Sequence, residues 1–457
     1  MKISILIILY LISISFSYFT FPFNKDKVEI TSKDNLTDTI TKLQEYKPFI
    51  TINIGSEKAN IKTYITQSKN ELFIGGKNVP NHKYDESTSS SYNCTNSEIK
   101  YINYAAYKEG YLSTETFNIK NGKNEIQEIN NVTFILGTEP TYQSLIMEGQ
   151  IGLHLPYRES FPEYNFIKSL KKANATESYN WYFDFDNFAN GGGQLVIDGY
   201  PHDVNNKKYN ETKYAKTNCL KNDYYTTWGL EFSSIYYDQA EFEISYYLEA
   251  HFEFDYGIIS APYEDNKMLD QLFFNKYIKN NICFKDYFGY SKDIFFYCKS
   301  SEFNVKEFKS IYLKSQDLEI IFELDYEDLF YKKDDYLIFL VVFKKDSKLW
   351  RLGTLFLQKY YIVFNNDDET VGYYQGMEKI RVEENKGENK SFKYIIIIIL
   401  LVLILVGIIV LIVVIFMKKI KPRKNRANEL DDVNFTYEQK NEESDDKKDQ
   451  LLFGNIN

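Results

Sequence analysis

The stretch Phe49-Ile-Thr-Ile-Asn-Ile54 alternates apolar and polar side chains, and Gly55-Ser56 follows it directly. Alternation at every second residue is typical of a β-strand with one buried face, and a Gly-Ser pair is typical of a turn. The same alternation returns in residues 60–66, 100–104 and 114–119. Many short strands separated by turns predict an all-β domain, built as a sandwich or a barrel.

The composition agrees with a large β-rich domain. The chain has 457 residues, 44% of them hydrophobic, which is enough for two or three lobes with a substantial core. Its 40 tyrosines and 35 phenylalanines favour strands. The net charge of −10 provides no basic surface for nucleic acid, so we expect no nucleic-acid partner.

The N-terminus is typical of an export signal. Lys2 precedes the apolar run Ile3–Ile14, and Ser15-Phe-Ser17 provides a small-x-small cleavage site. We therefore expect a signal peptide over residues 1–17. Residues 18–45 are polar and contain turn-forming residues, which predicts a short leader before the strands begin.

A second apolar run, Tyr394–Met417, has 24 residues without a charge. A helix rises about 1.5 Å per residue, so this length crosses a hydrocarbon core of about 30 Å. Lysines and arginines cluster directly after the run, which indicates the cytoplasmic side. The sequence thus predicts a single-pass type I membrane protein with a lumenal or extracellular domain, a stalk over 376–393, a transmembrane helix over 394–417 and a disordered cytoplasmic tail over 418–457.

The exported part has the marks of an oxidising, glycosylating compartment. Its four cysteines indicate two disulfides: Cys283–Cys298 closes a short loop and is favoured, which leaves Cys94–Cys219. No CxxC motif or histidine cluster is present in the sequence, so we expect no metal ion and no cofactor. The predicted N-glycosylation acceptors are Asn35, Asn93, Asn131, Asn174, Asn210 and Asn389.

Several segments occur in an order that a known family shares. Trp350-Arg-Leu-Gly-Thr-Leu-Phe-Leu-Gln-Lys-Tyr-Tyr-Ile-Val-Phe364 matches a closing run of the form W-I-L-G-D-x-F-L-R-x-Y-Y-x-V-F. Tyr46–Gly55 matches an opening strand and turn, and Glu148–Leu153 matches a D-G-I-L-G-L segment. Residues 102–119 match a flap hairpin, with Tyr104 at its tyrosine. Together these segments resemble the pepsin-like aspartic proteases over residues 46–375.

The resemblance implies a bilobal pepsin-like aspartic protease fold, with lobes over about residues 46–205 and 206–375. It also implies a cleft between the lobes that takes a peptide or protein ligand in extended form. In this family two facing carboxylates, each in an Asp-Thr/Ser-Gly loop, share one proton because they cannot both ionise at that distance. The ionised member deprotonates a water and the protonated member polarises the scissile carbonyl.

The first of these loops departs from the family pattern. Thr66 and Ser68 fall where the loop's Thr and Ser belong, but Ile65 occupies the Asp position and Gln67 the Gly position. Isoleucine has no proton to give or take. The resemblance therefore assigns Tyr104, Thr66 and Ser68 to ligand binding and leaves this loop without its catalytic acid.

The second loop keeps a carboxylate. Aligned on Gly257–Pro262, Glu253 occupies the Asp position, Phe254 the Thr position and Asp255 the Gly position. Glu253 and Asp255 are accordingly the candidate catalytic residues, and an ordinary charged loop is the alternative interpretation.

A missing member of a jointly acting pair removes most catalysis. We therefore expect a membrane-anchored aspartic peptidase homologue with impaired catalysis, which acts as a peptide- or protein-binding pseudo-protease. Two alternatives remain open from the sequence: an active aspartic-type endopeptidase with an atypical pair of acids, and a sorting or adhesion receptor that works through its tail.

Overall fold

The computed structural model describes residues 18–26, 29–67, 69–80, 82–100, 107–122, 124–140, 148–155, 165–185, 192–221, 226–241, 249–318 and 320–375. All of them belong to one compact unit, Met1–Arg381. No helix within these ranges is long and apolar enough to cross a membrane. The predicted signal peptide, stalk, transmembrane helix and tail lie outside the described residues.

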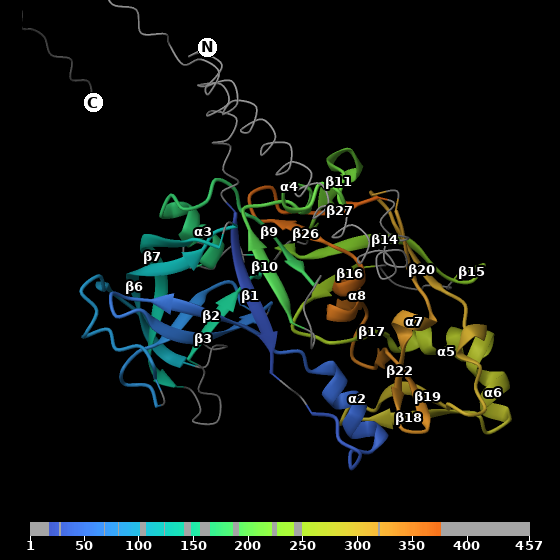
Figure 1. Ribbon diagram of the computed structural model, residues 1–457. Helices are drawn as coiled ribbons and strands as arrows, with labels where there is room; N and C mark the ends of the chain where they lie inside the picture. The colour runs from blue at the N-terminus through green and yellow to red at the C-terminus, as the bar shows by residue number, and fades with distance from the viewer. Residues whose placement is uncertain are drawn as a thin grey trace, which may run out of the picture. The chain divides into compact units, whose positions relative to one another are not determined.

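The predicted β-rich fold is confirmed, because most of the domain lies in two large sheets (Figure 1). The first sheet has the strand order β11-β27-β26-β9-β10-β1-β2-β3-β8-β4-β7-β6-β5. Its strands are β1 (Phe19–Lys25), β2 (Pro48–Ile54), β3 (Ala59–Thr66), β4 (Leu72–Gly75), β5 (Asn93–Lys100), β6 (Tyr107–Lys120), β7 (Ile126–Pro140), β8 (Gly149–Gly152), β9 (Asn180–Asp184), β10 (Gly193–Ile197), β11 (Tyr214–Asn218), β26 (Val363–Asn365) and β27 (Thr370–Tyr374).

The second sheet has the order β21-β20-β14-β16-β25-β17-β24-β19-β23-β22, with β15 on β14 and β18 on β19. Its strands are β14 (Gly229–Tyr237), β15 (Ala240–Glu241), β16 (Glu249–Glu253), β17 (Ile259–Pro262), β18 (Cys283–Phe288), β19 (Asp293–Lys299), β20 (Ile311–Ser315), β21 (Ile321–Leu324), β22 (Phe330–Lys333), β23 (Tyr336–Phe339), β24 (Val341–Lys344) and β25 (Trp350–Gly353). A separate two-stranded sheet joins β12 (Leu220–Lys221) to β13 (Thr226–Thr227).

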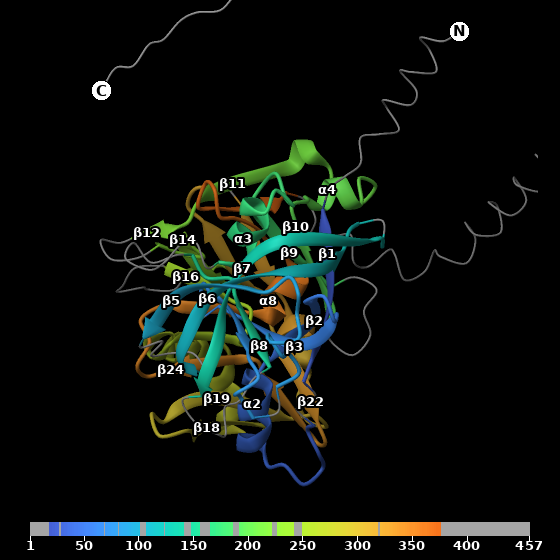
Figure 2. The ribbon, with the colours of Figure 1, turned by 90° about the vertical axis from the view of Figure 1, so that its left-hand side faces the viewer.

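Helices are short and lie around these sheets (Figures 1 and 2). The Asn165 side chain caps the helix α3 (Phe166–Lys172) by accepting from the Ile167 and Lys168 amides. The α-helices are α2 (Leu36–Gln44), α3 (Phe166–Lys172), α4 (Pro201–Val204), α5 (Asn266–Leu269), α6 (Asn275–Lys279), α7 (Tyr326–Leu329) and α8 (Thr354–Lys359). The 3-10 helices are η4 (Glu211–Lys213), η5 (Tyr263–Asp265) and η7 (Val305–Glu307), and η6 (Asp270–Phe274) is a π-helix.

One aromatic-rich core joins the two sheets. Trp181 of β9 stacks on Phe364 of β26 with ring centroids 4.2 Å apart. It also meets Trp228, which precedes β14, at 5.7 Å, and Phe254, which follows β16, at 5.5 Å. Trp181 and Trp228 are fully buried and Phe254 is nearly so. Aromatic side chains bury a large apolar area each, so these rings make up much of the contact between the two sheets.

The structure differs from the predicted leader over residues 18–45. β1 lies inside the first sheet, antiparallel to β10 on one side and to β2 on the other. Phe19, Phe21 and Phe23 alternate into the core. The segment is therefore an integral part of the fold, because its alternation provides one apolar face despite the polar residues between.

The helix α2 connects this N-terminal segment to the second sheet. Its Ile40 is fully buried in a cluster with Ile258 and Leu340. The Gly257 amide donates to the Gln44 carbonyl over 2.9 Å. An added Cβ at Gly257 would lie 2.2 Å from the carbonyl oxygen of Leu43, so the helix approaches the chain so closely that only glycine fits.

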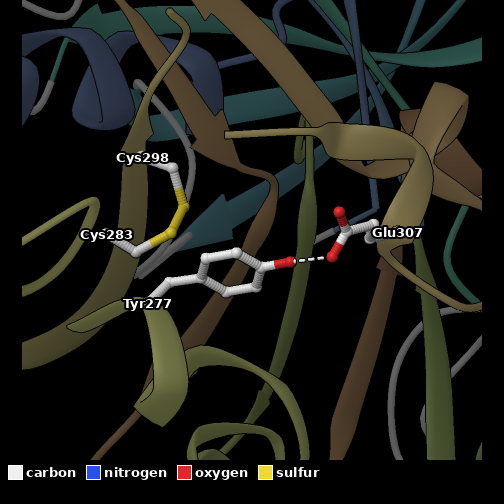
Figure 3. Close-up of a disulfide and its surroundings, with 4 residues drawn as sticks. All are labelled: Tyr277, Cys283, Cys298 and Glu307. Carbon is white, nitrogen blue, oxygen red and sulfur yellow. Dashed lines mark hydrogen bonds between the residues drawn. A yellow bond between two sulfur atoms is a disulfide. The ribbon is translucent and has the colours of Figure 1, made fainter. Parts of the chain in front are cut away.

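The disulfide Cys283–Cys298 is confirmed, and it joins directly opposed residues of β18 and β19 (Figure 3). The Tyr277 hydroxyl beside it donates a hydrogen bond to Glu307.

The predicted pairing of Cys94 with Cys219 was wrong, since both cysteines are free. Cys94 lies on β5 and Cys219 follows β11, at opposite ends of the first sheet's order, whereas a disulfide needs Cα atoms within about 7 Å.

Gly257→Ala should weaken the attachment of α2, because the new methyl group overlaps the Leu43 carbonyl. We expect a loss of about 1–3 kcal/mol in unfolding free energy, the usual cost of overpacking, and faster protease cleavage within residues 29–45. Gly289→Ala is the control: its Cβ would meet only the Ser291 hydroxyl at 3.9 Å, although its positive φ still costs about 1–2 kcal/mol. Equal cleavage of α2 in both variants and the wild type would contradict this packing.

Titration of the unreduced, denatured chain with a thiol reagent should find two free thiols, those of Cys94 and Cys219. Reduction before titration should raise the number to the four cysteines of the sequence. Cys219→Ser should leave one thiol in the unreduced protein. A count of zero in the wild type would restore the second disulfide.

Candidate functional site

The first candidate loop begins at the end of β3. Ile65 is paired with Ile151 of the parallel strand β8, and its side chain is only 2% exposed, within the core. The loop then folds over the end of β8, because the Leu153 amide donates to the Thr66 carbonyl over 3.0 Å. Ile65 thus has a packing role and supplies no group for proton transfer. Ser68 and Tyr104 lie outside the described residues.

The second candidate loop begins at Glu253, the last residue of β16. Its backbone is held by Thr354 at the start of α8, whose amide donates to the Tyr256 carbonyl over 2.7 Å and whose hydroxyl donates to the Phe254 carbonyl over 3.2 Å. These bonds and the buried Phe254 ring give residues 253–256 a defined conformation. The backbone from which Glu253 and Asp255 project is therefore held in place.

The two loops meet through side chains. Asp255 Oδ2 accepts from the Thr66 hydroxyl over 2.9 Å and from the Gln67 amide over 3.3 Å. In return, the Gln67 side-chain oxygen accepts from the Phe254 amide over 3.2 Å. Gln67 was noted in the sequence only as a departure from glycine. Its position opposite the second loop gives it a contact that no glycine could make.

Glu253 has a different partner from Asp255. Its Oε1 lies 3.4 Å from Nε of Arg351, and its side chain is 20% exposed. Burial raises the pKa of Glu253; Arg351 opposes this shift and Asp255 adds to it. The structure therefore places both predicted acids near one junction, but Asp255 is engaged by the first loop and Glu253 by Arg351.

Sequence reasoning missed the basic residues beside Glu253. His251 of β16 lies directly opposite Arg351 of β25 in the parallel register. Burial, and then the positive charge of Arg351, lower the pKa of His251 to about 4. A signal for them was present in the sequence: polar residues alternate with apolar ones along β16. Ala250 and Phe252 form its core face, so His251 and Glu253 lie together on the opposite face.

A buried carboxylic acid lies on the other side of β25. Asp265 accepts from the Trp350 indole Nε1 over 2.9 Å and is 8% exposed. Burial raises the pKa of Asp265 to about 6, and the hydrogen bond from Trp350 partly opposes the shift. Within the described ranges, no group of His, Cys, Asp and Glu side chains is arranged to hold a metal ion.

Comparison with models of protein families places the domain. A protein-family model described as eukaryotic aspartyl protease matches residues 49–375. No curated protein matches the chain.

His251 and Asp265 should affect stability in opposite directions as the pH falls. His251 titrates near pH 6.5 when unfolded and near 4 when folded, so the unfolded chain binds more protons in that window and acid destabilises the fold. Asp265 titrates near pH 3.8 when unfolded and near 6 when folded, so its contribution increases as the pH falls.

Removing either group should therefore leave the pH dependence of stability that the other group causes. Lowering the pH from 7 to 4.5 changes the unfolding free energy of each protein. Compared with the change in the wild type, we expect the change in His251→Gln to be more stabilising by about 2 kcal/mol and that in Asp265→Asn to be less stabilising by a similar amount. Chemical denaturation at both pH values measures the two differences. Parallel pH profiles for all three proteins would show that neither group is perturbed as described.

Proposed function

The chain belongs to the eukaryotic aspartyl protease family, and from that premise we propose that it is a membrane-anchored, catalytically impaired member that binds a peptide or protein. The family domain implies a cleft for an extended peptide, in which main-chain hydrogen bonds supply affinity. Binding of this kind needs the walls of the cleft but not the catalytic acids.

The observation that carries the proposal is the buried Ile65 at the position of the first acid. Hydrolysis in this family needs two carboxylates that share a proton across the junction. Ile65 is a hydrocarbon in the core, so the loop that should supply one of them has none. Losing one member of a unit that acts jointly removes most of its rate enhancement.

One observation favours the alternative of an active endopeptidase with an atypical pair. Glu253 and Asp255 lie two positions apart on one loop and influence each other electrostatically. Both acids already have partners, however: Thr66 and Gln67 donate to Asp255, and Arg351 pairs with Glu253. A pair serving hydrolysis would have to give up the two hydrogen bonds to Asp255 before it could hold a water, which weighs against this alternative.

Surface features support the proposed exported, glycosylated state. The five predicted acceptor asparagines inside the described ranges all have exposed side chains, as glycan attachment requires, whereas Asn389 lies outside those ranges. The disulfide Cys283–Cys298 fits an oxidising compartment. Membrane anchoring rests on the apolar run 394–417. The exposed acceptors are Asn35, Asn93, Asn131, Asn174 and Asn210.

A cleavage assay tests the proposal. The full-length protein, incubated with a mixed peptide library between pH 3 and 7, should release no fragments above background, while an active member of the family should cleave the same library. Glu253→Gln should therefore have no activity to remove. Cleavage by the wild type that disappears in Glu253→Gln would establish the endopeptidase instead.

A further inference from the structure

His251 and Arg351 present two basic side chains on one face of the second sheet. They are opposed in the parallel pair β16–β25, so their side chains project from the same face. Their neighbours Phe252 and Leu352, one position further along each strand, are buried in the core on the other face. The face that carries His251 and Arg351 also carries Glu253, at the junction of the two loops.

Two nitrogen atoms of this pair have no hydrogen-bond partner among the described residues. Nε2 of His251 and Nε of Arg351 are both shielded from solvent and unpaired. Glu253 lies 3.4 Å from Nε of Arg351, but the contact lacks the geometry of a hydrogen bond. A buried donor left unpaired costs about 1–3 kcal/mol, so native structures usually provide it with a partner.

Arg351 remains open to an incoming group. Its side chain is 41% exposed although Nε itself is shielded, so the rest of the side chain reaches solvent. The guanidinium presents several N–H donors in a planar fork that matches a carboxylate. A neighbouring imidazole adds one more N–H donor in the tautomer that carries its proton on Nε2.

We propose that His251 and Arg351 together form a carboxylate-binding site that selects an acidic residue, or a C-terminal carboxylate, of the bound peptide. This inference rests on the proposed peptide-binding function and names the chemistry of its ligand. Glu253 is the internal competitor: it holds Arg351 through a poorly directed ion pair, and the ligand carboxylate replaces it with directed hydrogen bonds.

The charges around the pair favour a carboxylate over a phosphate. Asp255 raises the pKa of Glu253, so two acids already lie close to the site. A phosphorylated residue carries about −1.5 to −2 charges at neutral pH, and repulsion from these acids grows with the charge of the ligand. A singly charged carboxylate gains the same Arg351 contact at a smaller electrostatic cost.

An oriented peptide library tests the inference. The full-length protein is incubated with extended peptides that have amidated C-termini, and the bound fraction is sequenced for enrichment at each position. We expect Asp and Glu to be enriched at one position by about tenfold. A parallel library with free C-termini distinguishes an acidic side chain from a C-terminal carboxylate as the bound group. If peptides of one fixed length are enriched in that library without an internal acid, the bound group is the terminal carboxylate.

Variants that change peptide affinity in opposite directions test which residues form the site. Arg351→Gln should lower affinity for the enriched peptide by about tenfold, and His251→Gln by less. Glu253→Gln should raise affinity several-fold, because it removes both the competitor for Arg351 and a like charge. Lys314→Gln is the matched control, since it removes one exposed positive charge from β20 of the same sheet and should change nothing. Thermal denaturation of each variant confirms that it is folded.

The outcomes separate this inference from the function on which it rests. Peptide binding without acidic enrichment, or equal enrichment in the wild type and Arg351→Gln, overturns the carboxylate site and leaves the peptide-binding function standing. Weaker acidic binding in Glu253→Gln overturns the role of Glu253 as competitor. Failure of the folded wild type to bind any peptide in either library overturns the proposed function itself.

Discussion

The hydrogen bonds around Asp255 and Gln67 are the constraint on which the centre of this protein depends. Asp255 accepts two bonds from the first loop, and Gln67 returns one to the amide of Phe254. Each bond joins residues nearly two hundred positions apart, at the ends of β3 and β16, which belong to different sheets. If either loop moved alone, a partly buried carboxylate and a buried amide would lose their partners together, and such losses are costly away from solvent. The loops therefore behave as one unit.

This unit changes what the two acids can do. Asp255 accepts hydrogen bonds from the first loop and so helps to hold the two loops together. The charge of Glu253 is balanced by that of Arg351. The family's catalytic geometry instead keeps both acids free to share a proton and a water. At Ile65 the corresponding volume is filled by a side chain in the core. The fold thus brings the two loops together through Asp255, Thr66 and Gln67, with Ile65 packed in the core beside them.

The sequence predicted the parts whose signals are local. Alternation in Phe49–Ile54 predicted β2, and the run beginning at Trp350 identified the family. Ile65 and Glu253 could be aligned because strands of recognisable pattern flank them. The role of residues 18–45 was missed, because alternating phenylalanines in a polar stretch do not reveal which strands will pair with them. The pairing of Asp255 with Thr66 and the isolation of Cys94 from Cys219 depend on distances between remote segments, and no local pattern encodes these.

The placement of the last two strands has a consequence for biosynthesis. β26 pairs with β9, and β27 pairs with β11, so the first sheet is completed by residues near the end of the domain. Until those residues emerge from the ribosome, β9 is an unprotected edge and Trp181 lacks the ring of Phe364 that covers it. At a translation rate of about 5–20 residues per second, the earlier strands remain without β26 and β27 for many seconds. A truncated or stalled chain would keep this edge exposed, so chaperones have a defined target in every incomplete copy.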